Sequence, residues 1–333
     1  MDRQYSIKRL WLQKDAKAYK AWSELMEKAS LHTDEQLDYT LGIYDNEKLI
    51  ASASFQKSVI KCVAVCRFYQ SENLLTALVT QLLEEMSTRG FVHYFLYTQP
   101  EKEMIFNSLG FKKIIATNDV LFMEQGVPDF KAYLELLQKY QQNGDNAAIV
   151  MNANPFTKGH QYLVETAAAK SDHVYVFVLS EELSEFTSEE RMNLVKQGVK
   201  HLTNVTVLPT QQYLVSQATF PAYFLKDKAE LSIAKVQATL DARLFKEEIA
   251  PILMIEKRYV GEEPYSPVTE VYNQAMRQVF GDHLNLVVLP RKEIAGDIIS
   301  ATKVRKALKE KDFIKLRTFL PETTFDYIVK KFK

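Results

Sequence analysis

Cysteine is scarce in this sequence. Its 333 residues include two cysteines, Cys62 and Cys66, which lie four positions apart in a strand-like run. A disulfide framework needs more cysteines, and a zinc site built on cysteine needs a different spacing. We therefore expect two buried free thiols with no role in function. The histidines other than His160 are scattered without metal-ligand spacing, so no metal site made by protein ligands is predicted.

Net charge and long apolar segments are also missing. Lys and Arg together number 42, as do Asp and Glu, so no overall field favours a polyanion or an anionic membrane. The longest apolar runs, such as Val174 to Leu179, have the length of strands and cannot cross a bilayer. The first twenty residues carry charges throughout and lack the apolar core of a secretory signal. We expect a cytoplasmic protein that binds neither nucleic acid nor membrane.

The composition is that of a globular protein with more than one core. Hydrophobic residues make up 47% and charged residues 25% of the chain. A chain of 333 residues is too long for one ordinary core, so two domains are expected. The polar, turn-forming residues 141–146 follow an amphipathic stretch and precede an apolar run. This seam predicts one domain over residues 1–140 and another over residues 146–333.

The first half alternates strand-like and helix-like segments. The predicted order is strands at 39–44, 48–55 and 59–68, a helix at 73–86, a strand at 93–98, a helix at 101–109 ended by Gly110, and strands at 111–116 and 120–124. This order, with the sequence NSLGF at 107–111, resembles the acetyl-CoA-dependent N-acetyltransferase fold over roughly the first 125 residues.

One feature of that fold is absent. Working members hold the pyrophosphate of acetyl-CoA on a glycine-rich turn at the start of the long helix. The corresponding stretch here, Gln70 to Leu78, contains no glycine. Side chains at those positions should block a close approach of the backbone. We expect an acetyltransferase-like α+β domain that has lost acetyl-CoA binding and serves as a docking or structural module.

The second half alternates short apolar runs with amphipathic helices. The predicted strands are 147–151, 174–179, 205–208, 252–255 and 284–289, with helices at 161–170, 188–201 and 269–280. This alternation predicts an α/β domain with a doubly wound, Rossmann-like parallel sheet. Ligands of such sheets bind outside the carboxyl ends of the strands.

The first candidate site is Thr157-Lys158-Gly159-His160, at the end of the first of these strands. Gly159 permits a tight turn, and the unpaired amides at the start of the next helix attract phosphate. The Thr157 hydroxyl and the His160 imidazole are both suited to phosphate oxygens. Taken alone, these four residues fit a capping threonine and a satisfied histidine better, because so short a pattern recurs often by chance.

The second candidate site is the segment Ile299 to Arg305, after the last strand. Ser300 is a good N-cap, and it would leave the amides of Ala301 and Thr302 facing outward. Arg305 lies one turn further on, so the segment predicts a second anion site at a helix N-terminus. A capped amphipathic helix with a solvated basic face explains the same residues equally well.

The two segments together resemble the paired signature of the nucleotidylyltransferase superfamily. Thr157 and His160 match its first motif, and Ser300, Thr302 and Arg305 match its second. The resemblance implies that both motifs face one crevice and hold one triphosphate. Three further stretches resemble the acetate:citrate-lyase ligase family, so the likeness covers nearly the whole chain. They are SEELSEF at 180–186, YLVSQATFPAYFLK at 213–226 and RYVGEEPYSPVTEVYN at 258–273. The stretches that contain the two motifs, NANPFTKGH and PRKEIAGDIISATKVR, resemble the same family.

That family resemblance implies a chemistry. Acetate would attack the α-phosphate of ATP, and the acetyl group would then pass to the thiol of the phosphoribosyl-dephospho-CoA arm on the acyl-carrier subunit of citrate lyase. Mg²⁺ would bridge the phosphates of ATP. A carboxylate nucleophile is already ionised, so the lack of a Ser-His-Asp or Cys-His signature does not count against an enzyme.

The resemblance also implies roles for individual residues. The residues expected to act in catalysis are His160, Thr157 and Arg305. Those expected to bind the nucleotide are Asn154, Pro155, Phe156, Gly159, Ser300, Ala301 and Thr302, with Arg258 and Gly261 after the fourth predicted strand. A salt bridge is nearly as good an interpretation of Arg258. Arg291 and Thr219 are expected to contact substrate, although an apolar turn explains Thr219 better.

Three other functions stay open at this point. The chain could be a different adenylyltransferase, such as the enzyme that makes dephospho-CoA from phosphopantetheine. It could be a docking module for a carrier protein without catalysis of its own. It could also be a bifunctional enzyme whose first domain still acetylates an amine. Pyrophosphate exchange and acetyl-CoA binding separate these alternatives.

Overall fold

The computed structural model describes residues 5–33, 36–70, 73–180, 182, 185–214, 220–225, 230–262, 267–294 and 297–332. The chain divides into two compact units. The first consists of Met1–Tyr133 and Pro221–Val236, and the second of Leu134–Phe220 and Gln237–Lys333. The first unit therefore includes a segment from the later part of the sequence.

The first unit is built on a seven-stranded mixed sheet. Its strand order is β1-β2-β3-β4-β5-β7-β6, and β4 and β5 are the neighbours that run parallel. The strands are β1 (Ser6–Arg9), β2 (Tyr39–Asp45), β3 (Lys48–Gln56), β4 (Val59–Val65), β5 (His93–Thr98), β6 (Lys112–Ala116) and β7 (Leu121–Gly126). The helices are α1 (Ala16–Lys28), α2 (Leu74–Thr88) and α3 (Glu103–Ser108), and the chain passes into the second unit within α4 (Phe130–Gln138). This arrangement confirms the expected acetyltransferase-like α+β fold.

Local chemistry explains several of these boundaries. Asp15 caps α1 by accepting from the amides of Lys17 and Ala18, at 2.9 and 3.0 Å. Gly110 follows α3 with a φ of 88°, the left-handed conformation that glycine adopts without strain. Cys62 is buried and Cys66 is partly exposed, and neither forms a disulfide. The expectation of two buried thiols therefore holds for Cys62 only.

The segment after residue 220 belongs to the first unit through tyrosine contacts. The Tyr223 hydroxyl donates to the carbonyl oxygen of Tyr97 at 2.7 Å. The amide of His32 donates to the carbonyl oxygen of Tyr223 at 2.8 Å. Because Tyr223 is almost fully buried, these bonds fix the segment against the sheet.

The second unit is a parallel sheet in the order β10-β9-β8-β11-β12. Its strands are β8 (Asn146–Met151), β9 (His173–Val178), β10 (Val205–Pro209), β11 (Ile255–Gly261) and β12 (Asn285–Leu289). The order confirms the predicted doubly wound fold. It also puts the switch point between β8 and β11, where connections leave on opposite faces and ligands bind outside the carboxyl ends.

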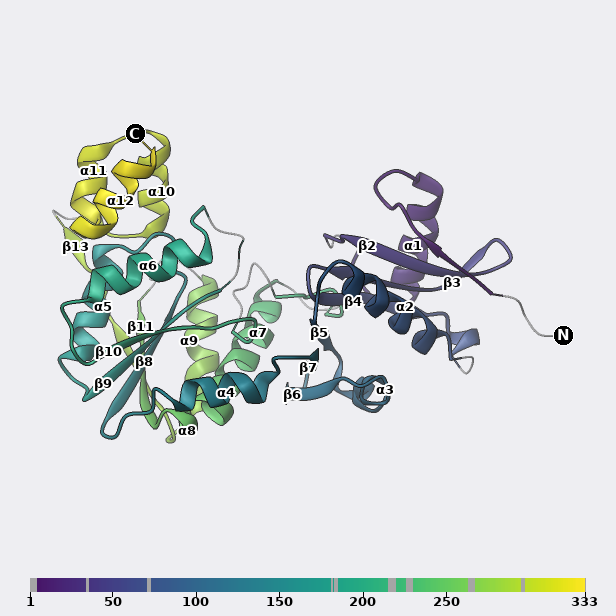
Figure 1. Cartoon of the computed structure of the whole chain (residues 1–333), viewed down its shortest axis with the longest axis horizontal. Helices are drawn as coiled ribbons and strands as arrows, with labels where there is room; N and C mark the ends of the chain where they lie inside the picture. Colours follow the sequence, from purple (N-terminus) through teal and green to yellow (C-terminus); the bar gives the residue numbers. More distant parts are fainter. Residues whose placement is uncertain are drawn as a thin grey trace. The chain divides into compact units, whose positions relative to one another are not determined.

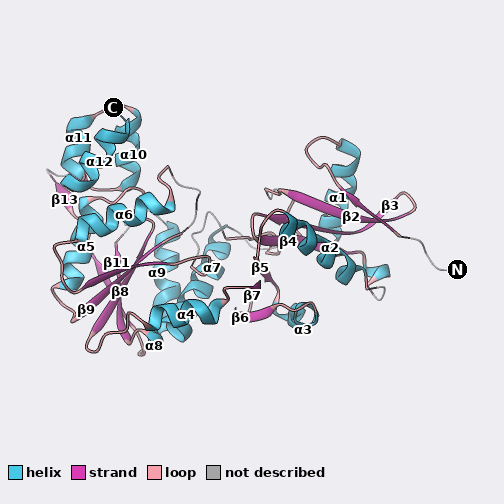
Figure 2. Cartoon of the chain, viewed as in Figure 1, coloured by secondary structure: helices cyan, strands magenta, loops and turns pink. Residues whose placement is uncertain are grey.

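Helices cover both faces of this sheet (Figures 1 and 2). They are α5 (Lys158–Ala168), α6 (Ser188–Val199), α7 (Glu230–Leu244), a π-helical turn (Phe245–Ile249), α8 (Ala250–Ile252), α9 (Pro267–Phe280), α10 (Ala301–Lys309), α11 (Phe313–Phe319) and α12 (Glu322–Phe332). One face carries Ile149, Val176 and Tyr259 and shares a core with α5, α6 and the C-terminal helices. On the other face, Phe177 packs edge-to-face on Phe245 with ring centroids 6.1 Å apart.

The fourth strand begins later than predicted. The sequence indicated a strand at 252–255, whereas β11 spans Ile255–Gly261. Pro251 stands in the first turn of the short helix α8, where its missing amide costs nothing. Met254 then takes a φ of 54°, which ends that turn and starts the strand. Arg258 consequently lies inside β11 and not in a loop after it.

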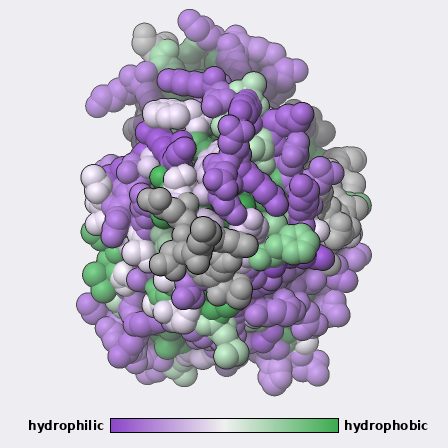
Figure 3. Space-filling model, turned by 90° about the vertical axis from the view of Figure 1, so that its right-hand side faces the viewer, coloured by the Kyte–Doolittle hydropathy of each residue, from purple (hydrophilic) through white to green (hydrophobic). Residues whose placement is uncertain are grey.

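Two observations concern the surface of the molecule. In the part of the chain that the structure describes, no helix combines the length and the apolar character needed to cross a bilayer. The face seen in Figure 3 is mostly hydrophilic, with hydrophobic side chains in small separate patches. Scattered patches of this kind are normal on globular proteins.

Candidate functional site

A cleft of about 780 Å³ opens at the carboxyl ends of β8, β11 and β12. Its size falls in the usual range of small-molecule sites. Residues from both motifs line it, although the motifs are far apart in the chain. The cleft brings together ten residues predicted from the sequence: Asn154, Thr157, Gly159, His160, Gly261, Arg291, Ser300, Ala301, Thr302 and Arg305.

Thr157 and His160 form a reciprocal cap at the start of α5. The amide of His160 donates to Oγ1 of Thr157 at 3.3 Å, and the amide of Thr157 donates to Nδ1 of His160 at 3.0 Å. Because Nδ1 accepts this bond, a neutral ring carries its proton on Nε2. The histidine is therefore a preoriented donor at the mouth of the cleft.

The ring of His160 is held in its neutral form. Burial, followed by the positive charge of Arg291, lowers the pKa of His160 to about 4. This shift occurs although the residue keeps some solvent contact in the cleft. At neutral pH, His160 can thus donate a hydrogen bond to an anion without adding a full charge.

The sequence indicated a tight turn at Gly159. The turn of the first motif does not fall there. Gly159 is helical, and the left-handed residue of the loop is Ala153, with a φ of 51°. A Cβ placed on Gly159 would lie 3.7 Å from side-chain atoms of Ile299, in the second motif. Glycine at 159 therefore leaves room in the cleft where the two motifs approach each other.

The second motif begins α10 in the same manner. Oγ of Ser300 accepts from the amide of Lys303 at 3.2 Å, as expected of an N-cap. Among the described residues, no acceptor is recorded for the amides of Ala301 and Thr302, nor for those of Lys158 and Gly159 on α5. Two helix N-termini thus present free amides to one cleft, which is how proteins bind phosphate.

Arg305 joins the two motifs. Its Nη1 donates to the carbonyl oxygen of Asn154 at 2.8 Å, and its Nη2 donates to Oγ1 of Thr302 at 3.0 Å. Arg291 adds a second link, because its Nη1 donates to the carbonyl oxygen of Ile299 at 3.3 Å. Its Nε also donates to the carbonyl oxygen of Glu262, just after β11, at 2.7 Å.

The charge of the cleft has one sign. Its described lining residues include the four cations Arg291, Lys292, Lys303 and Arg305, and they include no aspartate or glutamate. Four like charges around one cavity create a positive field that attracts an anion. Lys303 was expected beside Arg305 in the second anion site, whereas Lys292 was not singled out from the sequence, although it lies next to Arg291.

Four predicted residues fall outside the cleft or outside the described structure. Pro155 and Phe156 are buried, and neither lines the cleft. Phe156 instead packs against Gly198 on α6, where an added Cβ would lie 2.3 Å from its ring. Arg258 is discussed next, and Thr219 lies outside the described residues.

Arg258 forms a buried ion pair on the opposite face of the sheet. Side chains alternate along β11, so Tyr259 joins the α5 face and Arg258 points to the other side. Its Nη2 lies 3.1 Å from Oδ2 of Asp241, and its guanidinium stacks 4.6 Å from the ring centroid of Phe245. The expectation that Arg258 lies at the rim of the nucleotide site was wrong in position. The alternative, a salt bridge in a loop, is right about the ion pair and wrong about the loop, because Arg258 lies within β11.

A buried arginine that the sequence did not reveal fixes the first motif. Arg191 on α6 is fully buried, and its Nη1 donates to the carbonyl oxygen and to Oδ1 of Asn152, at 2.9 and 2.6 Å. Its Nε donates to the carbonyl oxygen of Phe186 at 3.2 Å. Such a residue orients the loop between β8 and α5 without lining the cleft. Its place in a helix gave no sequence signal.

Comparison with known proteins finds members of one family. Residues 146–328 match a family model described as the citrate lyase ligase C-terminal domain. The citrate (pro-3S)-lyase ligase of Haemophilus influenzae is 37% identical over 310 residues, which cover 90% of this chain and 92% of that protein. The ligase of the same name from Escherichia coli K12 is 33% identical over 314 residues, covering 92% of this chain and 89% of that protein.

Solved structures resemble parts of the chain. A GNAT-family acetyltransferase structure from Desulfovibrio desulfuricans covers 37% of this chain and 99% of its own, at 14% identity. The TM-score is 0.32, which is too low to support a conclusion about function.

Proposed function

The chain belongs to the citrate lyase ligase family, and from that premise we infer that it is an ATP-dependent acid–thiol ligase that activates citrate lyase by acetylation. The observation that carries the proposal is the cleft at the sheet's switch point, with two helix N-termini, four cations and no carboxylate among its described lining residues. Such a surface suits a polyphosphate. We take its ligand to be the triphosphate of ATP.

The first step is an in-line displacement. A carboxylate oxygen of acetate attacks the α-phosphorus of ATP, and the bond to the β-phosphate oxygen breaks. The bonding pair leaves with pyrophosphate, and acetyl-adenylate remains. Acetate is ionised at neutral pH, so no general base is required. The protein contributes position and charge neutralisation.

The residues of the cleft have different roles in this step. Nε2–H of His160 donates to an α- or β-phosphate oxygen, and the free amides of α5 and α10 meet the same chain of phosphates. Arg305 and Ser300 hold the departing pyrophosphate, while Arg291 approaches from the end of β12. Removing one such donor typically lowers the rate by about 10²–10³.

The second step forms the thioester. A thiolate attacks the carbonyl carbon of acetyl-adenylate, the carbon–oxygen bond to AMP breaks, and AMP leaves with the bonding pair. We propose the phosphoribosyl-dephospho-CoA arm of the acyl-carrier subunit of citrate lyase as the source of this thiol.

The cleft does not fit a resident metal ion. No aspartate or glutamate is among its described lining residues, and protein sites for Mg²⁺ usually supply one or two carboxylates. The described residues also contain no cluster of three metal-ligating side chains anywhere in the chain. Mg²⁺ would therefore enter bound to the phosphates of ATP.

Isotope exchange between ATP and pyrophosphate tests the first step. Acetate, propionate and phosphopantetheine are supplied separately as acceptors. We expect exchange that depends on acetate and falls about 10²-fold or more in Arg305→Gln. The matched control is Lys306→Gln, which removes the adjacent cation outside the cleft and should retain full exchange. Exchange that requires phosphopantetheine and ignores carboxylates would instead identify a different adenylyltransferase.

Transfer of acetate to the partner tests the second step. Radiolabelled acetate, ATP and deacetylated citrate lyase should give labelled carrier subunit and active lyase. The label should be lost on treatment with hydroxylamine, as expected of a thioester. Exchange without any transfer would leave an adenylating enzyme whose acceptor is some other thiol.

A further inference from the structure

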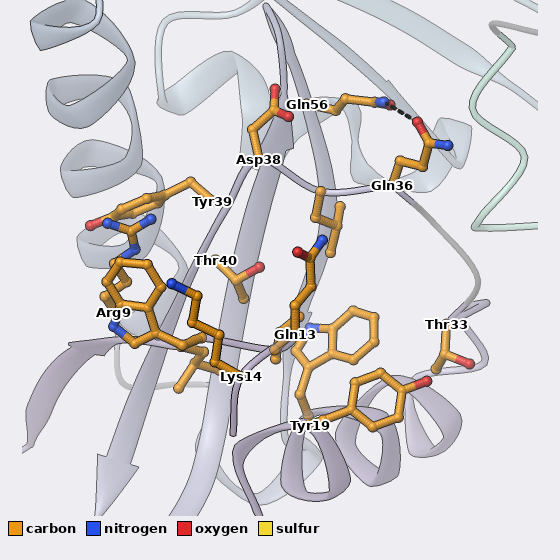
Figure 4. A pocket seen from close by; sticks show the side chains of 15 residues that line it. Arg9, Gln13, Lys14, Tyr19, Thr33, Gln36, Asp38, Tyr39, Thr40 and Gln56 are labelled. Carbon is orange, nitrogen blue, oxygen red and sulfur yellow. Dashed lines mark hydrogen bonds between the residues drawn. The ribbon is translucent and has the colours of Figure 1, made fainter. Parts of the chain in front are cut away.

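The first unit contains a pocket that the adenylating chemistry does not use. Its volume is about 540 Å³, and Arg9, Trp11, Lys14, Tyr19, Trp22 and Tyr39 are among the residues that line it (Figure 4). We call it the tryptophan pocket, because Trp11 and Trp22 are the two tryptophans of the chain. It lies where β1 ends and β2 begins, beside the start of α1.

One wall of the pocket carries two positive charges. The guanidinium of Arg9 lies 3.5 Å from the ring centroid of Trp11 and 4.6 Å from that of Tyr39, so the two rings hold it between them. The ammonium of Lys14 lies 5.3 Å from the ring of Trp11, on the same wall (Figure 4). Among the described carboxylates, none forms an ion pair with Arg9 or Lys14.

This arrangement is typical of a site prepared for an anion. Stacking on aromatic rings fixes the plane of a guanidinium and leaves its N–H edge available for hydrogen bonds. Asp38 also lines the pocket, but among the described carboxylates none pairs with Arg9 or Lys14, so both positive charges remain available to an anionic group. The wall therefore suits a phosphate or a carboxylate.

The rest of the pocket suits a flat ring. Trp11 and Tyr19 are 48% and 43% exposed, which leaves large aromatic surfaces uncovered at the opening. Trp22 is 1% exposed, and its buried Nε1 has no acceptor among the described residues. A buried indole N–H normally has a partner, because leaving it unpaired costs about 1–3 kcal/mol. Gln13 and Thr33 add polar groups across from Arg9 (Figure 4).

From these features we propose that the tryptophan pocket binds a small organic anion that carries a planar ring, of the class of a nucleoside monophosphate. The anionic group lies against Arg9 and Lys14. The ring lies along Trp11 and Tyr19, with an acceptor atom toward the Trp22 indole. This binding is independent of the adenylation proposed for the second unit.

Intrinsic fluorescence tests the proposal directly, because both tryptophans line this pocket and none lies elsewhere in the chain. AMP, adenosine and ribose 5-phosphate are the three probes, titrated into the full chain. We expect a saturable change with AMP. Adenosine lacks the anion and ribose 5-phosphate lacks the ring, so each should bind at least tenfold more weakly. A saturable response to AMP that either fragment reproduces at equal affinity contradicts the proposal.

Substitutions in the tryptophan pocket test whether AMP binds there. Arg9→Gln should weaken AMP binding roughly 10- to 100-fold, the usual range for a hydrogen bond to a charged group. The matched control Lys8→Gln removes the neighbouring cation, which lies over Tyr44 outside the pocket. It should bind AMP as the unmodified chain does. Lys14→Gln serves as a second variant if Arg9→Gln fails to fold.

The result can be separated from that of the adenylating cleft. Arg305→Gln should lose pyrophosphate exchange and keep the fluorescence titration with AMP, whereas Arg9→Gln should do the reverse. Equal AMP affinity in Arg9→Gln, Lys14→Gln and Lys8→Gln would overturn the proposal, as would a fluorescence response that vanishes in Arg305→Gln.

Discussion

Nη1 of Arg305 donates a hydrogen bond to the carbonyl oxygen of Asn154, 2.8 Å away and 151 positions earlier in the chain. The bond fastens the helix of the second motif to the loop of the first. Because the same guanidinium also reaches Oγ1 of Thr302, its plane is fixed before any ligand enters. Preorganisation of this kind is how an enzyme avoids reorganising charge during the reaction.

Arg305→Lys separates charge from geometry. Lysine keeps the positive charge but is a point donor that cannot hold both partners in one plane. We expect acetate-dependent pyrophosphate exchange to fall by about 10²-fold, with little change in thermal stability. Steady-state exchange and a melting curve measure the two effects. Full activity in Arg305→Lys would mean that the link to Asn154 has no part in catalysis.

The titration of His160 offers a second test. Its pKa of about 4 in the folded chain lies below the ordinary value of 6.5, so the unfolded chain binds more protons between these two values. The stability contribution of the neutral ring is therefore complete above pH 6.5 and is lost as pH falls toward 4. The loss amounts to roughly 3 kcal/mol at most.

Proton NMR can follow this ring. The resonance that disappears in His160→Gln identifies it among the six histidines. We expect its chemical shift to stay constant from pH 8 to about pH 5.5, and urea denaturation to show a smaller loss of stability at acid pH in His160→Gln. A titration midpoint near 6.5 would show that the ring is not held neutral by its surroundings.

The site motifs were predictable because their chemistry is local. Thr157 and Ser300 cap their helices through residues three positions later, and such spacing is visible in a sequence. The doubly wound parallel sheet was predictable from the β-α alternation in the same way, whereas its strand order was not predicted. The number of residues between the two motifs does not tell how close they lie in the fold. The hydrogen bond from Arg305 to Asn154 shows that they are in contact.

Other features depended on contacts between distant residues. Arg258 was misplaced because the start of β11 is set by Pro251 and Met254, and a shift of three residues decides which side chains fall inside the strand. The function of Arg191 depends on carbonyl groups from two other segments. The tryptophan pocket joins residues of β1, α1 and β2, and none of these forms a motif.

Arg258 should prove to be a stabilising residue and not a substrate contact. Removal of one partner from a buried ion pair leaves an uncompensated charge, which costs about 3–5 kcal/mol. We expect Arg258→Met to be destabilised by about this amount, as measured by urea denaturation. The double variant Arg258→Met with Asp241→Leu should recover much of the loss, because no buried charge remains.

Exchange activity distinguishes the two roles of Arg258. Well below its melting temperature, Arg258→Met should keep pyrophosphate exchange within a few-fold of the unmodified chain. The contradicting result is an Arg258→Met variant with unchanged stability and no pyrophosphate exchange. That result would place Arg258 in contact with a substrate, as the sequence had indicated.

Lys158, which lies between Thr157 and Gly159 in the first motif, links that motif to the C-terminal helices. Its Nζ donates to the carbonyl oxygens of Arg317 and Thr318, at 3.1 and 2.8 Å, at the end of α11. Terminal carbonyl groups of a helix lack partners within it, and a cation near them is favourable. Lys158→Met keeps the aliphatic stem and removes both bonds. We expect a loss of roughly 1 kcal/mol in stability and faster amide hydrogen exchange in α11 and α12.

The control for Lys158 is Lys315→Met, which removes a cation that lies over Phe319 on α11 itself. Hydrogen exchange followed by mass spectrometry compares the two variants segment by segment. Acceleration of α11 in Lys158→Met but not in Lys315→Met is the expected pattern, because only Lys158 ties α11 to the first motif. If both variants leave the exchange of α11 unchanged, the helix is held by its apolar contacts, with Leu316 and Phe319 in the core, and the two bonds from Lys158 add no measurable stability to it.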